Sequence, residues 1–322
     1  MGALGPLVGE MLGVERAPSR LRRRRSASAG QDPDDSVAGR ILAGLSQRLA
    51  RWVGEGSELD PRVLRYDGKG EGEPIVLVPG GLTGWFSWIP HQERLADRHR
   101  VIRVQPIHNE LGSAGQPGES GYTVEVEREA LRMTLDELGL EQAHLAGWSG
   151  GGKALLEFAT EYPQRVRTLT LVEPAAYWIL EQLGDRDEVV DELNAFIHPL
   201  FGRDVTEDDL ATFLEFAGFV SSQSEARSHP NWDRWVPHRM ALSWQGEELD
   251  HPARTVDDLV SVAVPTLLVK GTVTADWLKR VVDVLGDRLS NAAVLELEGD
   301  HACHIQSMDA FLAAFEAHLA GD

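Results

Sequence analysis

From about residue 62 onward, short apolar runs alternate with longer segments whose apolar residues recur at helical spacing. Runs of this length are typical of buried strands, and the segments between them are long enough for helices. The alternation predicts an α/β fold in which helices flank a mostly parallel central sheet. The predicted strands are residues 63–66, 75–78, 100–104, 143–147, 168–172, 265–269 and 294–297. The predicted helices are residues 124–138, 153–161, 276–286 and 309–319.

The alternation stops between residues 174 and 262, which are rich in acidic and aromatic residues and contain no clear strand pattern. Strands resume afterwards, so one sheet with an inserted helical segment explains the order better than two sequential domains. We therefore expect a core formed by residues 57–173 and 263–322, with a helical cap at 174–262.

The start of the chain has a different composition. Residues 1–30 hold six arginines against two glutamates, a local charge of +4. Such a segment could target the protein or bind an anionic surface, but no apolar signal core follows the arginines. We expect residues 1–36 to be a disordered arginine-rich tail and linker. Residues 37–56 show apolar positions at helical spacing, which predicts an amphipathic helix.

Composition limits the possible partners. The net charge of −20 over 322 residues argues against nucleic acid, because phosphate binding needs a basic surface. No apolar run has transmembrane length. The single cysteine, Cys303, excludes an intrachain disulfide and is consistent with a reducing, cytoplasmic compartment. No nucleotide-binding glycine pattern or metal-ligand cluster is present, so we expect a small-molecule substrate and no cofactor, and leave the oligomeric state open.

The pentapeptide Gly147-Trp148-Ser149-Gly150-Gly151 directly follows the apolar run at 143–146 and precedes a predicted helix. A serine on such a sharp turn is held clear of the sheet, at the positive end of the next helix. Small glycine neighbours make this strained turn possible. Ser149 is therefore the predicted nucleophile.

A serine hydroxyl needs a general base and oxyanion donors. His301 follows the predicted strand at 294–297 in a loop, and we predict that it is the base. Among the other histidines, we interpret His304 as a packing residue and His144 as a core residue. His91 and His108 fall in predicted loops without a partner pattern, while the cap histidines could face substrate: His229, His238 and His251.

Backbone amides are the predicted oxyanion donors. One belongs to Gly150, the residue after the nucleophile. The other should come from the loop after the strand at 75–78, where we favour Gly81 over Leu82.

Three motifs, in order, resemble the α/β-hydrolase fold superfamily over about four-fifths of the chain. They are Val78-Pro79-Gly80-Gly81, the Ser149 pentapeptide, and residues 299–304 with the helix that follows. The resemblance implies a serine-nucleophile branch with a helical cap and a third catalytic residue that is acidic. Met308 departs from a proline that is frequent in the family.

The position of the acid is open. In many members it lies three residues after the glycine that ends the strand here predicted at 265–269, and that position is Thr274. Asp276 lies two residues later. Other members carry the acid at the end of the strand here predicted at 168–172, which is Glu173. We favour Glu173 and keep Asp276 as the alternative.

The aromatic residues near these motifs suggest an apolar or aromatic substrate, with Trp85, Trp148 and Trp178 as candidate binding residues. We therefore expect a carboxylester hydrolase that works through an acyl-enzyme. One alternative is a carbon–carbon bond hydrolase of the same fold. Another is a non-catalytic small-ligand binding protein, which the threonine at 274 keeps open.

Overall fold

The computed structural model describes residues 61–185, 188–246 and 254–321. All of them belong to one compact unit, Val53–Asp322. The predicted tail at 1–36 and the predicted amphipathic helix at 37–56 lie outside the described residues, as does His251.

A seven-stranded sheet forms the centre of this unit, in the order β1-β3-β2-β4-β5-β6-β7. Only β1 runs antiparallel to its neighbour β3, and the other pairs are parallel. The predicted mostly parallel α/β sheet is confirmed. The strands are β1 (Arg65–Lys69), β2 (Pro74–Val78), β3 (Arg100–Gln105), β4 (Ala143–Trp148), β5 (Val166–Val172), β6 (Thr266–Gly271) and β7 (Ala292–Leu297).

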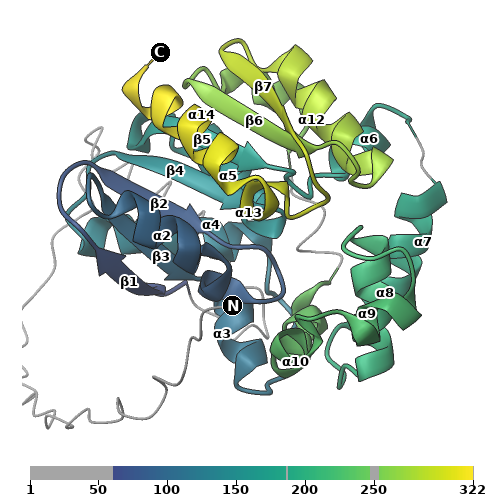
Figure 1. The fold of residues 1–322 in the computed structure, drawn as a ribbon. Coiled ribbons are helices and arrows are strands. Elements are labelled where there is room, and N and C mark those ends of the chain that lie inside the picture. The colour runs from purple at the N-terminus through teal and green to yellow at the C-terminus, as the bar shows by residue number, and fades with distance from the viewer. Residues whose placement is uncertain (1–60, 186–187, 247–253, 322) are drawn as a thin grey trace, which may run out of the picture. The chain divides into compact units, whose positions relative to one another are not determined.

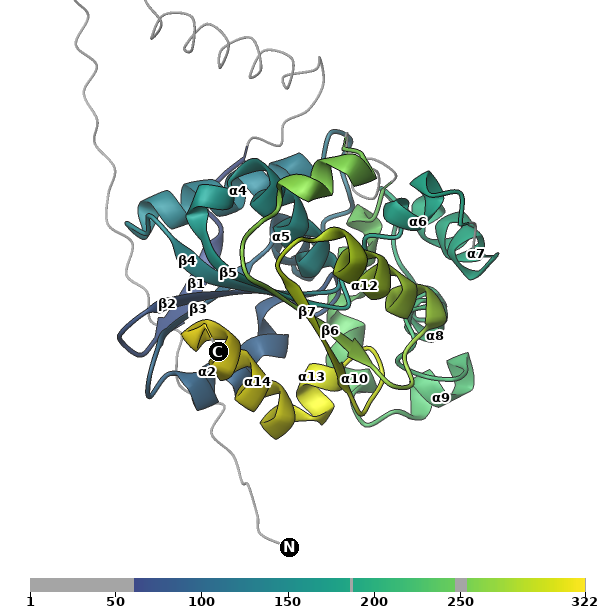
Figure 2. The ribbon, with the colours of Figure 1, turned by 90° about the horizontal axis from the view of Figure 1, so that it is seen from above.

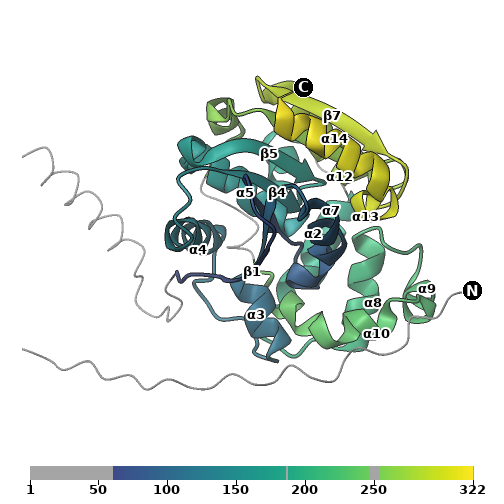
Figure 3. The ribbon, with the colours of Figure 1, turned by 60° about the vertical axis from the view of Figure 1, so that its left-hand side comes forward.

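Helices cover both faces of the sheet, as Figure 2 shows. α4, α5 and α12 lie on one face, and α2 and α14 lie on the other (Figures 2 and 3). These elements and their short neighbours are η1 (Gly84–Trp88), α2 (Ile89–Leu95), α3 (Ile107–Ser113), α4 (Val124–Glu137), α5 (Gly150–Glu161), η2 (Pro163–Arg165), α12 (Asp276–Arg288), α13 (Cys303–Gln306) and α14 (Met308–Ala320).

The segment between β5 and β6 contains helices and no strand among its described residues. Because it leaves the sheet after Val172, it starts at the edge where the parallel strands end. Figure 1 shows α7 to α10 grouped beside the sheet. Its elements are α6 (Trp178–Gln182), α7 (Glu188–Ile197), η3 (His198–Leu200), α8 (Glu207–Phe216), α9 (Gln223–Ser228), α10 (Trp232–Trp235), η4 (Val236–Trp244) and η5 (Val256–Ser261).

The central strands are the most buried because helices cover them on both sides. Every residue of β4 is buried, as expected for a strand in the middle of a parallel sheet. Trp88 and Trp148 pack with Phe311 and Phe315 of α14 in one large core cluster. This packing fixes the end of β4, from which the pentapeptide turn emerges.

The elements that differ from prediction are short or exposed. β1 begins at Arg65 rather than Val63, and all five of its residues are exposed, so no apolar pattern marks it. η1, α2 and α3 were not predicted, because helices of five to seven residues carry little periodic signal. No helix among the described residues is both long and apolar enough to cross a bilayer.

Candidate active site

Ser149 lies between the end of β4 and the start of α5. Its backbone angles are φ 54° and ψ −119°, an uncommon conformation for a residue with a side chain. Its amide donates a hydrogen bond to the Val172 carbonyl at 2.9 Å, which ties the turn to β5. The strain is therefore held by the surrounding sheet, as is common at functional sites.

The flanking glycines are required by close backbone contacts. A Cβ on Gly151 would lie 2.3 Å from the Pro79 carbonyl oxygen, and one on Gly147 would lie 2.7 Å from the Gly151 oxygen. No side chain fits at either position without moving the main chain. The turn therefore packs directly on the loop that follows β2.

His301 and Glu173 form a buried pair. The Nδ1–H of His301 donates to Oε2 of Glu173 at 2.6 Å, and the Glu173 side chain is completely buried. Glu173 directly follows β5 and has a φ of 42°, the second non-glycine residue with positive φ among those described. Since Nδ1 faces the carboxylate, Nε2 is the nitrogen that can accept a proton from a nucleophile.

Two further donors hold the Glu173 carboxylate. The Gly271 amide donates to Oε1 at 2.6 Å, and the Thr274 hydroxyl donates to Oε2 at 2.9 Å. The residue at the family's usual acid position is thus a hydrogen-bond donor to a carboxylate on the neighbouring strand. Sequence reasoning missed this role for Thr274. One signal could have indicated it: threonine occupies one of the two acid positions of the family, Thr274, while glutamate occupies the other, Glu173.

Asp276 is not part of this arrangement. It begins α12, its side chain is 92% exposed, and its carboxylate lies 3.8 Å from Nζ of Lys279. The structure brings Glu173, and not Asp276, to His301.

The predicted oxyanion amides lie next to one another. A Cβ on Gly150 would lie 3.7 Å from the Gly81 nitrogen, and one on Gly80 would lie 3.4 Å from Cβ of Ser149. Leu82 is buried in the same loop, and its carbonyl accepts a hydrogen bond from Asn109. The structure thus brings Gly81 beside the turn that carries Ser149.

Trp148 links the turn to the histidine loop. Its indole N–H donates to the His301 carbonyl at 2.8 Å, and the two rings lie 5.4 Å apart. Phe219, from the segment between β5 and β6, packs against both rings at 5.8 and 5.2 Å. Trp148 therefore positions the loop that contains His301, and its ring packs beside that histidine.

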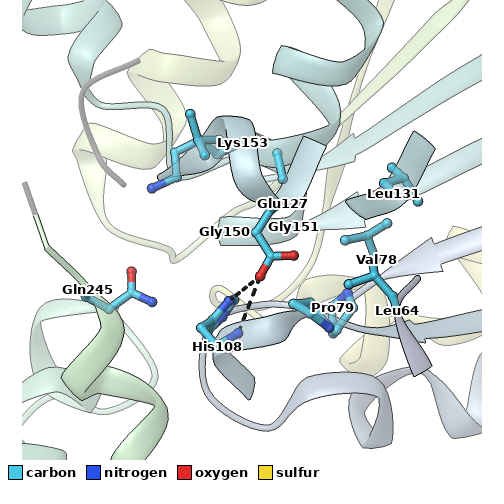
Figure 4. A pocket seen from close by; sticks show the side chains of 14 residues that line it. Leu64, Val78, Pro79, His108, Glu127, Leu131, Gly150, Gly151, Lys153 and Gln245 are labelled. Carbon is cyan, nitrogen blue, oxygen red and sulfur yellow. Dashed lines mark hydrogen bonds and ion pairs between the residues drawn. The ribbon is translucent and has the colours of Figure 1, made fainter. Parts of the chain in front are cut away.

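Two hollows lie beside Trp148 and the glycines of the turn. A pocket of about 730 Å³ is lined by Trp148, Phe219 and Trp235, a size and lining suited to a small organic molecule. A second cavity of about 30 Å³, lined by Gly81 and Gly150 among others, is shown in Figure 4. That volume accommodates about two water-sized groups, so it can take part of a substrate but not the whole molecule.

The other two candidate tryptophans have different surroundings. The Trp85 ring lies 5.7 and 5.9 Å from the guanidinium groups of Arg65 and Arg103, on the β1–β3 side of the sheet. Trp178 begins α6 and is almost completely buried. Neither lines the two hollows, and both contribute to packing.

His91 and His304 form a neutral, buried pair behind Trp148. Their rings stack at 5.2 Å, and the His304 ring lies 4.8 Å from Trp148. Burial lowers the pKa of His91 to about 3 and lowers the pKa of His304 well below its usual value. The predicted packing role of His304 agrees with this environment.

The expectation for His91 and His108 is wrong. Both lie in helices, α2 and α3, and both have partners: His91 bonds the His304 carbonyl, and His108 contacts Glu127. His144 is buried between Thr168 and Glu73, as expected of a core histidine. The partners of His108 are Tyr122 and Glu127. They were missed because they lie 14 and 19 residues away, outside α3.

Within the part of the chain that the structure describes, no three histidine, cysteine or carboxylate side chains are grouped closely enough to hold a metal ion. The residues that the structure brings together are His301 with Glu173, and Gly81 with the turn that carries Ser149.

Comparison with known proteins agrees with this architecture. The sequence profile described as alpha/beta hydrolase fold matches residues 73–271. The chain is 39% identical over 109 residues to a protein of Azorhizobium caulinodans assigned as a carbamate hydrolase, covering 34% of this chain and 40% of that protein. It is 28% identical over 224 residues to the 2-hydroxymuconate semialdehyde hydrolase of a Pseudomonas species, covering 66% of this chain and 77% of that enzyme.

Among solved structures, the carboxylesterase CesB of Bacillus subtilis is similar with a TM-score of 0.62 and 19% identity. That similarity covers 88% of this chain and 98% of CesB. At this level of identity the likeness shows the fold alone. The chain spans less than half the length of the Azorhizobium relative, so the activity of that protein is not transferred with the match.

Proposed function

Because the chain belongs to the alpha/beta hydrolase fold family, we propose that it is a serine hydrolase whose nucleophile is Ser149. His301 is the general base, Glu173 orients it, and the amides of Gly81 and Gly150 bind the oxyanion. The observation that carries the proposal is the buried 2.6 Å contact between His301 and Glu173. A fully buried carboxylate against one imidazole nitrogen is what a serine nucleophile needs from its base.

The chemistry proceeds in two displacements. Ser149 Oγ attacks the substrate carbonyl carbon while its proton moves to Nε2 of His301, and the carbonyl oxygen becomes an oxyanion. His301 then returns the proton to the leaving group, which departs and leaves an acyl-enzyme. Water repeats the sequence: His301 takes its proton, and the acid product leaves as Ser149 is reprotonated.

The Glu173 carboxylate stabilises the imidazolium form of His301. The Gly271 amide and the Thr274 hydroxyl hold this carboxylate by hydrogen bonds to its two oxygens. We infer that Glu173 and Thr274 together do what a single acid after the strand corresponding to β6 does in many relatives.

We propose that residues 174–262 act as a cap over the site. Phe219 and Trp235 come from this segment and line the pocket beside Trp148. The aromatic side chains of this lining suit an ester with a small aromatic or acyl part, and Arg234 and Asp300 line the same pocket. A cytoplasmic location stays a prediction.

A second candidate is hydrolysis of a carbon–carbon bond next to a carbonyl. It is favoured by the match to a 2-hydroxymuconate semialdehyde hydrolase, which covers more of this chain than the carbamate hydrolase match. The binding-protein hypothesis loses its main support, since it depended on a missing acid and Glu173 contacts His301.

A substrate panel distinguishes these candidates. It contains 4-nitrophenyl esters of short and long acids, lactones, and chromogenic dienoic acids from ring cleavage. The proposal predicts turnover of at least one short ester and its loss in Ser149→Ala. Faster turnover of a dienoic acid than of any ester would favour the carbon–carbon hydrolase, and no turnover of any substrate would count against both.

A further inference from the structure

A second histidine lies beside the proposed oxyanion amides. His108 is the second residue of α3 and is buried, with only 7% of its surface exposed. Its Nδ1 lies 2.8 Å from the Tyr122 hydroxyl and 3.1 Å from Oε1 of Glu127. Its other nitrogen, Nε2, is buried and has no hydrogen-bond partner among the described residues.

The unpartnered nitrogen faces the small cavity. His108 and Gln245 line the 30 Å³ hollow together with Gly81 and Gly150. A Cβ on Gly81 would lie 3.8 Å from Nε2 of His108 and 3.3 Å from Nε2 of Gln245. Figure 4 shows the Glu127 carboxylate joined to His108 by dashed lines, with the Gln245 side chain pointing toward His108.

We propose that His108 is a further catalytic residue, whose Nε2–H donates a hydrogen bond to the substrate carbonyl oxygen as that oxygen becomes negatively charged. It would act as a third donor beside the amides of Gly81 and Gly150. This inference rests on the proposed serine hydrolase function. It explains why a buried polar nitrogen is left without a partner in this cavity.

The network behind the ring supports a donor at Nε2. Burial and the nearby Glu127 charge raise the pKa of Tyr122, so its hydroxyl keeps its proton. The Tyr122 hydroxyl donates that one proton to Oε1 of Glu127, so Nδ1 of His108 is the donor toward the Tyr122 and Glu127 oxygens. A ring that is protonated at both nitrogens and paired with the Glu127 carboxylate presents an Nε2–H to the cavity.

The same network fixes the ring. Glu127 belongs to α4 and Tyr122 to the loop before it, and both side chains are buried. These two side chains therefore hold the imidazole of His108 in a single orientation. A fixed donor stabilises a developing charge more than a mobile one, because it does not need to reorganise during the reaction.

The test compares three variants on the best ester of the panel. His108→Phe removes the donor and keeps a ring, and His108→Gln keeps an amide N–H near the position of Nε2. His144→Gln is the matched control, because His144 is also a buried histidine beside a glutamate but lies at the start of β4. Circular dichroism and thermal melting establish that each variant is folded.

We expect His108→Phe to lower kcat about 100-fold with KM changed less than threefold, the loss typical of one oxyanion donor. His108→Gln should recover at least tenfold of that loss, and His144→Gln should stay within twofold of wild type. A His108→Phe kcat within threefold of wild type would overturn the inference, as would a loss of equal size in His108→Gln.

A second measurement does not depend on folding of the variants. A phenylboronic acid forms a tetrahedral adduct with a serine nucleophile and places a boronate oxygen in the oxyanion site. Nitrogen NMR of the wild-type protein should then show a new hydrogen-bonded Nε2–H signal for His108 on addition of the boronic acid. An unchanged His108 signal in a formed adduct overturns this inference alone. If no adduct forms at Ser149 and no ester is turned over, the proposed function itself fails.

Discussion

The Thr274 hydroxyl donates a hydrogen bond to the Glu173 carboxylate at 2.9 Å, across the ends of two adjacent strands. This contact joins the two positions at which the family places its acid. Glu173 supplies the carboxylate, and Thr274 supplies a hydroxyl that donates a hydrogen bond to it. The arrangement leads to a clear ranking of three side chains in catalysis.

Glu173→Gln should lower kcat/KM about 10³- to 10⁴-fold, because the imidazole loses the charge that stabilises its protonated form. Thr274→Val should lower it about tenfold, since one hydrogen bond to a charged group is removed. Asp276→Asn should leave it unchanged, because that side chain is 92% exposed. Steady-state kinetics on one ester decide the ranking. A large loss in Asp276→Asn with a small loss in Glu173→Gln would reverse the assignment.

Gly151→Ala should destabilise the fold and reduce activity together. Its new methyl group would lie 2.3 Å from the Pro79 oxygen, so the turn or the loop after β2 must move. Overpacking of this kind costs about 1–3 kcal/mol of unfolding free energy. Urea unfolding followed by tryptophan fluorescence measures the change.

Gly68→Ala is the control for that variant. Its methyl group would meet only Ile102 at 3.8 Å, an ordinary contact in an exposed edge strand. Its unfolding midpoint should match wild type. Equal midpoints for both variants would show that the tight turn is not held by backbone contact.

Stability should fall as the pH drops below about 6.5. The folded protein keeps His91 neutral, with a pKa of about 3 that burial lowers from 6.5, and keeps His304 neutral for the same reason. The unfolded chain takes up protons at these histidines near pH 6.5, and the folded chain does not. Each histidine therefore reduces the unfolding free energy by about 1.4 kcal/mol per pH unit between about 6.5 and its folded pKa.

The measurement is the urea midpoint at pH 7.5, 6 and 5. His91→Phe retains a ring in the stack with Trp88 and His304 and removes one titrating group, so its profile should be flatter. A wild-type midpoint that is constant from pH 7.5 to 5 would contradict the account of these histidines.

Cys303 should be unreactive in the folded protein. Its side chain is completely buried, and burial, followed by the charge of Glu173, raises the pKa of the thiol. Because the thiolate is the reactive species, alkylation by iodoacetamide should require unfolding. Rapid alkylation of Cys303 in native buffer, with activity intact, would contradict this prediction.

The apolar pattern was sufficient for most of the sheet and for the turn at Ser149. Strands β2 to β6 are mostly buried and continuous, so hydrophobic runs mark them directly. β7 is half exposed, yet its sequence still alternates enough to be placed. β1 was displaced by two residues, because an exposed antiparallel edge strand has no apolar requirement.

The site was predicted only as far as local motifs reach. Ser149, Gly150 and His301 stand in short sequence patterns. For the acid, which contacts His301 from 128 positions away, the family resemblance offered Glu173 and Asp276, and we favoured Glu173 without excluding the other. The roles of Thr274 and His108 depend on which side chains the fold brings together. A single sequence carries no spacing rule for such contacts, so they could not be predicted.

The most direct test of the central claim is covalent labelling of Ser149 by a fluorophosphonate, followed by peptide mass spectrometry. We predict one phosphonyl group on the peptide that contains Ser149, no label in Ser149→Ala, and much slower labelling in His301→Ala and Glu173→Gln. The Asp276→Asn variant should be labelled at the wild-type rate. Wild-type protein that stays unlabelled beside a reactive control esterase, or that is labelled at another residue, would contradict the assignment of Ser149 as the nucleophile.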